Sequence, residues 1–214
     1  MTPDLIALAQ QCAPQVSPFT MAAIVRTESG FNPFAIGVVH GRLLRQPANE
    51  AEAVATARAL AREGWDFSVG LAQVSRANWS TYGLDEYNAF DPCRNLAAGA
   101  AILEGCFERA RSARLNTRPD PQSALRNSLS CYASGNFSVG FRTGYVQRVV
   151  ANATAVARSS QVPVVVPAIA PIPVVPDELA PPARSRSGAH ALPRPVDVSP
   201  ATPASAPDGS AVVF

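Results

Sequence analysis

The sequence predicts a mainly α-helical domain at residues 1–158, followed by a disordered proline-rich tail at residues 159–214. Three observations lead to this fold class. Apolar residues recur at helical spacing through most segments before residue 158. Only the stretch 38–44, a glycine between short apolar runs, indicates a small β-hairpin insertion. From residue 159 onward the composition changes, and 12 of the 20 prolines fall within the last 56 residues.

The helix between Ser17 and Gly30 has the clearest boundaries. We expect the Ser17 hydroxyl to cap its first turn, and Pro18 suits the first helical position because that position needs no N–H. Gly30 tolerates the left-handed conformation that ends many helices. Three apolar residues and Glu28 occupy positions i, i+3, i+4 and i+7 of this helix, so an apolar face ends in a carboxylate (Met21, Ile24, Val25).

Two interpretations of Glu28 are open from this helix alone. In the first, the carboxylate lies at the rim and points to water, because burying a lone charge is costly. In the second, it is half-buried without a partner, which raises its pKa and makes it a proton donor near neutral pH.

The other elements follow from helix caps and apolar spacing. Asn49 can cap a helix at residues 51–62, with Glu52 in capping-box spacing. A polar, irregular loop is expected at residues 112–120. Further helices are expected at residues 4–12, around 75–79, from Asp91-Pro92 onward, from about 123 to 132, and at about 143–158 with Tyr145 on its apolar face. Asn95 is expected to brace the start of its own helix.

Charge and hydropathy exclude two classes of partner. The net charge is +2, and the basic residues, all of them arginine, are scattered rather than gathered in a run, so we expect no nucleic-acid partner. No segment is apolar for long enough to cross a membrane. Residues 1–9 lack the basic start and apolar core of a signal peptide, which leaves the export route open.

The four cysteines, at positions 12, 93, 106 and 131, are dispersed along the chain. No pair has the spacing of a zinc or redox motif, and His40 and His190 lie far from them, so we expect no metal site and no cofactor. An even number of dispersed cysteines favours two disulfides and an oxidising compartment. Four buried free thiols are the alternative, and three disulfide pairings are possible.

Four ordered segments resemble one family. They are Thr27-Glu28-Ser29-Gly30-Phe31-Asn32-Pro33, Gly70-Leu71-Ala72-Gln73-Val74, Asp91-Pro92-Cys93-Arg94-Asn95-Leu96-Ala97-Ala98-Gly99 and Cys131-Tyr132-Ala133-Ser134-Gly135-Asn136-Phe137. Together they resemble the lysozyme-like lytic transglycosylases of the soluble lytic transglycosylase superfamily. The third and fourth segments are most similar to the branch attached to type IV secretion systems. The resemblance covers roughly residues 5–155.

The resemblance implies an activity and a location. Members of this family cleave the β-1,4 bond between N-acetylmuramic acid and N-acetylglucosamine in peptidoglycan, and they close a 1,6-anhydro ring on the muramoyl residue. It further implies a periplasmic protein whose partners are glycan strands and the components of a type IV secretion system. The composition of the proline-rich tail, independently of the resemblance, predicts a disordered spacer or, alternatively, a docking peptide.

The resemblance also implies roles for individual residues. Glu28 would protonate the leaving oxygen and then accept the proton of the muramoyl C6 hydroxyl. Gln73 would line the sugar groove, and Tyr132 would lie close to the Glu28 carboxyl and hold it by a hydrogen bond. Ser29 and Asn136, which lie in the matched segments, are further predicted substrate-binding residues, although Ser29 equally suits a helix end.

Two alternative functions remain open. A hydrolytic muramidase would need a second carboxylate about 5–10 Å from the first, and Asp66 is the candidate for it. A non-catalytic peptidoglycan-binding subunit of the secretion channel would not need the carboxyl group of Glu28 at all.

Overall fold

The structure, a computed structural model, describes residues 3–112 and 120–160. Within these ranges it contains seven α-helices, two short 3-10 helices and a three-stranded antiparallel sheet, which confirms the predicted fold class. The elements in chain order are α1 (Pro3–Cys12), α2 (Pro18–Glu28), β1 (Ile36–Val38), α3 (Glu50–Arg62), β2 (Phe67–Val69), β3 (Val74–Ser75), η1 (Arg76–Asn78), η2 (Ser80–Tyr82), α4 (Pro92–Ser112), α5 (Pro121–Ser134), α6 (Val139–Arg142) and α7 (Tyr145–Ser160).

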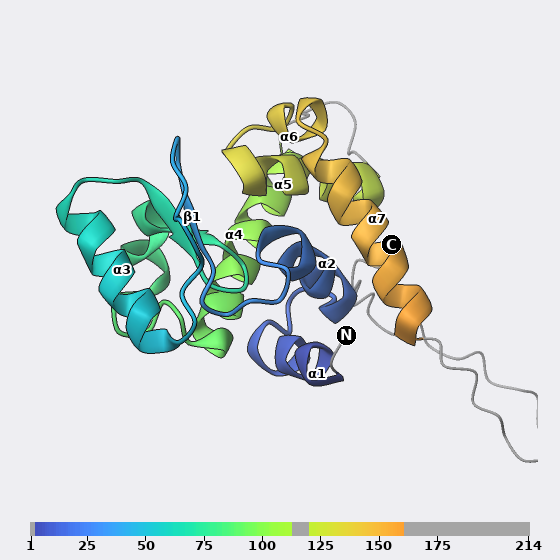
Figure 1. Cartoon of the computed structure of the whole chain (residues 1–214). Coiled ribbons are helices and arrows are strands. Elements are labelled where there is room, and N and C mark those ends of the chain that lie inside the picture. The colour runs from blue at the N-terminus through green and yellow to red at the C-terminus, as the bar shows by residue number, and fades with distance from the viewer. Residues whose placement is uncertain (1–2, 113–119, 161–214) are drawn as a thin grey trace, which may run out of the picture. The chain divides into compact units, whose positions relative to one another are not determined.

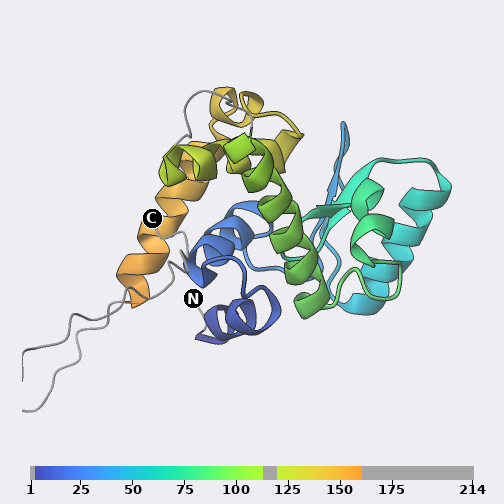
Figure 2. The ribbon, with the colours of Figure 1, turned by 180° about the vertical axis from the view of Figure 1, so that it is seen from behind.

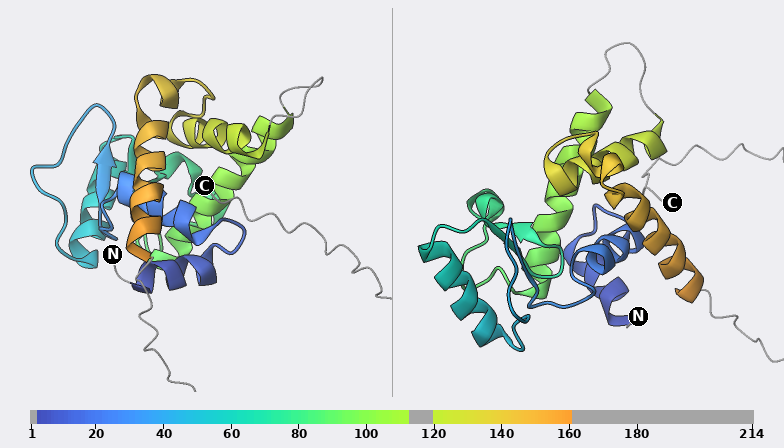
Figure 3. Two further views of the ribbon diagram at one scale, coloured as in Figure 1. Left: turned by 90° about the vertical axis from the view of Figure 1, so that its right-hand side faces the viewer. Right: turned by 45° about the horizontal axis from the view of Figure 1, so that its top comes forward.

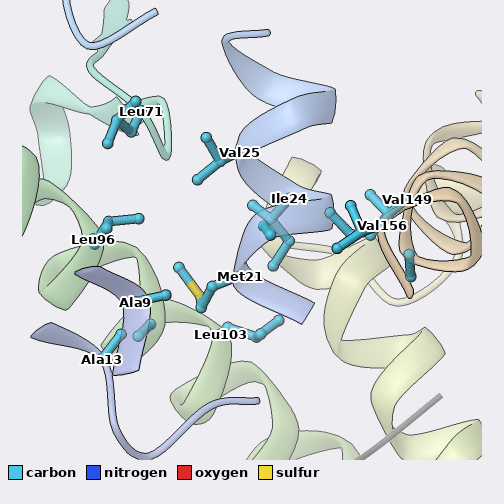
Figure 4. Close-up of a cluster of buried hydrophobic side chains, with 14 of the residues drawn as sticks. Ala9, Ala13, Met21, Ile24, Val25, Leu71, Leu96, Leu103, Val149 and Val156 are labelled. Atoms are coloured by element: carbon cyan, nitrogen blue, oxygen red, sulfur yellow. The ribbon is translucent and has the colours of Figure 1, made fainter. Parts of the chain in front are cut away.

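Helix α2 lies at the centre of the first of two hydrophobic cores. Its apolar face is fully buried, and α1, α4 and α7 contribute side chains to the same cluster. Figure 4 shows Met21 beside Leu103 of α4, and Ile24 on the side of α2 where Val149 and Val156 of α7 lie. Helix α7 lies alongside α2 in Figure 1 and in both views of Figure 3. Helix α2, which ends in Glu28, is therefore held in place by helices packed on several of its sides.

The second core lies under the sheet. Strand β1 pairs antiparallel with β2, and β2 pairs antiparallel with β3. One face of the sheet packs with α3 in a cluster that includes Ile36, Phe67, Val69 and Val74. Figure 2 shows α4 running between this part of the molecule and the helices around α2. Helix α4 supplies buried residues to both cores, and it thereby links them.

The position of the predicted hairpin is wrong. Of residues 38–44 only Val38 lies in a strand, and β1 pairs with β2, which follows about thirty residues later in the chain, beyond α3. The prediction favoured a local partner because the two halves of a hairpin normally adjoin in sequence. Here α3 lies between the two paired strands in the sequence, and its Ala53 and Ala57 pack in the second core.

The helix ends agree with the sequence in most details. Asn49 caps α3 by accepting the N–H of Glu52 at 3.0 Å, and Gly30 has a φ of +59° beyond the end of α2. One expected cap is wrong, because the Ser17 side chain makes no capping hydrogen bond and only its backbone carbonyl accepts from Met21. The short helix α6 was not anticipated.

Two disulfides are formed, so the alternative of four free thiols is excluded. Cys12 of α1 is bonded to Cys93 of α4, and Cys106 of α4 is bonded to Cys131 of α5. Both bonds tie neighbouring helices to α4. No helix in the described ranges has the length and apolar character needed to span a bilayer.

Two predicted segments lie outside the described residues. The proline-rich tail was placed at residues 159–214, of which only Ser159 and Ser160 are described, at the end of α7. Most of the irregular loop at residues 112–120 also lies outside these ranges.

Candidate active site

Glu28 is the last residue of α2 and stands at the end of its buried apolar face. The helix stops there because Gly30 adopts the left-handed conformation, which turns the chain away. The carboxyl group is half-buried, as in the second of the two interpretations of Glu28, but it has a hydrogen-bond partner, which that interpretation did not include. The neighbouring Ser29 hydroxyl donates to the carbonyl of Val25 at 3.0 Å and so acts on its own helix end.

A cleft of about 310 Å³ opens beside Glu28. Some of its lining residues belong to the sheet and to the segments next to it, and the others belong to α2, α4 and α5. The lining residues are Glu28, Gly37, Val38, Val39, Ser68, Gln73, Val74, Ser75, Asn78, Ile102, Tyr132 and Ala133. The structure therefore brings together three of the predicted site residues, Glu28, Gln73 and Tyr132.

The environment of Glu28 favours its protonated form. Burial raises the pKa of this carboxyl from 4.5 to about 7, and it outweighs two influences that lower the pKa. The first is a hydrogen bond of 2.5 Å from the Tyr145 hydroxyl to Oε1 of Glu28, and the second is the positive charge of Arg148. The guanidinium of Arg148 lies 5.9 Å from the centre of the Tyr145 ring. At neutral pH the group can therefore both give and take a proton.

The predicted hydrogen bond from Tyr132 to Glu28 is wrong. The Tyr132 hydroxyl donates instead to the backbone carbonyl of Ala72, at 2.5 Å. Gly99 of α4 permits this contact, because a Cβ at that position would lie 2.6 Å from the Ala72 side chain and 3.1 Å from the Tyr132 oxygen. Tyr132 thus anchors the loop that carries Gln73, and it also lines the cleft itself.

Tyr145 holds the carboxyl group in place of Tyr132, and sequence reasoning missed it. It was counted as one residue of the apolar face of the last helix. One signal was present, because a buried tyrosine needs a partner for its hydroxyl. Its partner lies 117 residues away, and only the packing of α7 against α2 brings the two side chains together.

Gln73 is held in a fixed orientation. Its backbone has a φ of +48°, and its side-chain amide Nε2 donates to the carbonyls of Ala35 and Gly70, both at 3.0 Å. Its Oε1 lies on the side of Gly37, where a Cβ would approach it to 2.7 Å. Both amide donors are thus occupied by the protein, and the oxygen is left as the acceptor.

Asn95 has a larger role than bracing its own helix. Its fully buried side chain accepts the N–H of Ala72 at 2.8 Å and donates to the carbonyls of Val69 and Ala89, both at 2.9 Å. Gly70 is required beside it, because a Cβ there would lie 2.3 Å from Asn95 Nδ2. Asn95 and Tyr132 together fix the loop from Gly70 to Gln73.

Asn136 and Asp66 do not line the cleft. Asn136 is exposed, and its Oδ1 accepts the N–H of Ser138 at 2.8 Å in the turn that leads into α6. Asp66 is also exposed, and its backbone carbonyl accepts from Val39. The substrate-binding roles assigned to Asn136 and Ser29 stay predictions. Among the described residues, no group of three or more His, Cys, Asp or Glu side chains is arranged to hold a metal ion.

Known proteins of one family are similar in sequence to this chain. The family model described as "Transglycosylase SLT domain" matches residues 6–153. A protein of Brucella abortus biovar 1 (strain 9-941), named "Type IV secretion system protein virB1", is 47% identical over 216 residues, which cover 99% of this chain and 88% of that protein. "Protein virB1" of Agrobacterium fabrum (strain C58) is 38% identical over 143 residues, which cover 66% of this chain and 56% of the relative. No solved structure matches the chain at a comparable level of significance.

Proposed function

The chain belongs to the family of transglycosylase SLT domains, and from that premise we propose that it is an active lytic transglycosylase of peptidoglycan. It cleaves the β-1,4 bond between N-acetylmuramic acid and N-acetylglucosamine and leaves a 1,6-anhydro end on the muramoyl residue. One observation carries the proposal. Glu28 has a pKa of about 7 and is the only carboxyl group among the described residues that line the cleft.

The proposed reaction uses this one carboxyl group twice. Oε1 of Glu28 accepts the hydrogen bond from Tyr145, so Oε2 carries the proton toward the substrate. In the first step Glu28 donates this proton to the glycosidic oxygen as the bond from that oxygen to C1 breaks. In the second step the carboxylate takes the proton of the C6 hydroxyl, whose oxygen forms the new bond to C1. Both steps are feasible near neutral pH because the pKa lies there.

The absence of a second carboxyl group from the described cleft lining favours this reaction over hydrolysis. A hydrolase of the common kind has two carboxyl groups that flank the scissile bond. Asp66, the candidate for the second one, is exposed and lies outside the cleft lining. In the lytic reaction the substrate itself supplies the nucleophile, so Glu28 is sufficient.

We further propose that the protein works in the periplasm and opens the cell wall locally for a type IV secretion or conjugation apparatus. The relatives named as type IV secretion system proteins support this role. Two disulfides suit an oxidising compartment. Its partners would be glycan strands and components of the secretion channel.

Mass spectrometry of the soluble products from purified sacculi tests the proposal. We expect wild-type protein to release muropeptides with 1,6-anhydro ends, and Glu28→Gln to release none. Glu104→Gln is the matched control, because Glu104 is exposed and lies outside the cleft, and it should act like wild type. Products with reducing ends would identify a hydrolytic muramidase. Full activity of Glu28→Gln would refute the role of this carboxyl group.

A further inference from the structure

Two side-chain hydrogen bonds in the described part of the chain join helix α7 to helix α2. Tyr145 donates to Glu28 at 2.5 Å, and Nδ2 of Asn152 donates to Oγ1 of Thr27 at 2.9 Å. Tyr145 and Asn152 are seven residues apart on α7, so they share one face of the helix and lie about two turns apart. Thr27 and Glu28 are consecutive on α2. The contact in the active site and the second hydrogen bond therefore belong to the same pair of helices.

Asn152 is a polar residue on the face of α7 that packs against α2. Val149, Ala153 and Val156 of α7 are buried in the first core. Figure 4 places Val149 and Val156 on the side of α2 where Ile24 lies. Asparagine is a poor residue for a helix interior, because its side chain competes for backbone hydrogen bonds. What Asn152 contributes to this helix pair is therefore its hydrogen bond to α2.

Thr27 offers Asn152 an acceptor that is fixed in place. The Thr27 hydroxyl donates to the carbonyl of Ala23 at 2.7 Å within α2, and its oxygen remains free to accept from Asn152. Both side chains are half-buried. A hydrogen bond restricts distance and direction, whereas apolar contacts between two helices have no preferred direction. The hydrogen bond from Asn152 therefore limits how far α7 can slide or rotate on α2.

We propose that the hydrogen bond between Asn152 and Thr27 sets the position of α7 on α2, so that Tyr145 reaches the carboxyl group of the active site. Asn152 and Thr27 are then positioning residues, because neither lines the cleft and both act through Tyr145. Tyr145 is the first residue of α7. Its own hydrogen bond fixes only that end of the helix, and the contact about two turns later supplies a second directional restraint.

This inference rests on the proposed function, because it concerns the same carboxyl group. Tyr145 and the positive charge of Arg148, both on α7, act on the pKa of Glu28, and the charge of Glu28 acts on Tyr132 of α5. Among the described residues, no charged side chain of α1 or α4 is one of the influences on that pKa. The two positioning residues carry no charge and do not titrate. Because the hydrogen bond from Tyr145 lowers the pKa of Glu28, losing it raises the pKa above about 7.

The activity of the full chain on purified sacculi, measured as a function of pH, tests the inference. Asn152→Leu keeps the approximate size of the side chain and removes the donor, and Thr27→Val removes the acceptor. We expect each variant to lower kcat roughly threefold with little change in KM, and to move the alkaline limit of activity to higher pH. Thr27→Ser keeps the acceptor and should behave like the wild type. Each of the two variants tests the hydrogen bond by itself, so a folding defect in one leaves the other decisive.

Two further proteins distinguish positioning from a general loss of stability. In the double variant Tyr145→Phe/Asn152→Leu, the second change should have no further effect on kcat or on the alkaline limit, because the hydroxyl that Asn152 positions is already gone. Effects that multiply in the double variant would overturn the inference. Thr154→Val is the matched control, because it removes a hydrogen bond to the carbonyl of Val150 at an exposed position of the same helix. It should leave the pH profile unchanged.

The pKa of Glu28 provides a measurement that does not depend on the reaction. In the wild type the free energy of unfolding falls with rising pH up to the native pKa of this group, about 7. In Asn152→Leu and Thr27→Val this fall should extend to higher pH in urea denaturation. An unchanged range would overturn the role of the hydrogen bond, while anhydro products from the wild type would still support the transglycosylase. An extended range with reducing-end products would support the inference and contradict the proposed reaction.

Discussion

Replacing Glu28 by Gln should make the protein more stable at alkaline pH while it removes the activity. Burial raises the pKa of Glu28 from 4.5 to about 7, so between these two pH values the native protein holds a proton that the unfolded chain has released. The free energy of unfolding therefore falls as the pH rises through this range, and it becomes independent of Glu28 above it. The two pKa values differ by an amount equivalent to at most about 3 kcal/mol.

Gln is neutral throughout this range, and its side-chain oxygen can still accept the hydrogen bond from Tyr145. We therefore expect the variant to lose the decline in stability between pH 4.5 and about 7. Above that range the free energy of unfolding should exceed that of the wild type by up to about 3 kcal/mol. Urea unfolding followed by circular dichroism, at several pH values and with the disulfides intact, measures the difference.

Glu104→Gln provides the control, because its carboxyl group is exposed and it should follow the wild-type curve. If the free energies of unfolding of wild type and Glu28→Gln changed with pH in the same way, burial would not raise the pKa of the Glu28 carboxyl group. The reasoning that links burial to proton donation would then be refuted.

Two other predictions concern the residues that hold the site. Tyr145→Phe removes a hydrogen bond that lowers the pKa of Glu28, so the alkaline limit of activity should move to higher pH and kcat should fall roughly tenfold with little change in KM. Tyr132→Phe is the control and should leave the alkaline limit unchanged. If the pH profile of Tyr145→Phe superimposed on that of the wild type, Tyr145 would not be the residue that holds Glu28. Asn95→Ala leaves one buried N–H and two carbonyls unpaired, so the free energy of unfolding should fall by roughly 3 kcal/mol in urea denaturation. A loss below about 1 kcal/mol would show that the Gly70–Gln73 loop is held by other contacts.

The sequence predicted the features that depend on local chemistry. The cap at Asn49 and the left-handed Gly30 follow from the conformations that these residue types prefer close to their own positions. The apolar spacing of α2 placed Glu28 at the end of a buried face, and the number of cysteines indicated two disulfides. Each of these inferences requires only the residues close by in the sequence or the number of residues of one type.

The tertiary structure decided every feature that joins distant segments. The partner of β1 lies beyond α3, and the tyrosine that holds Glu28 lies on the last helix rather than on α5. Apolar spacing shows that Tyr132 and Tyr145 both face inward, but it cannot show which hydroxyl meets which acceptor. That choice follows from how α7 packs on α2 and from Gly99, which lets Tyr132 reach Ala72. Hydrogen bonds act over about 3 Å, so their partners are fixed only when packing has set the distances between helices.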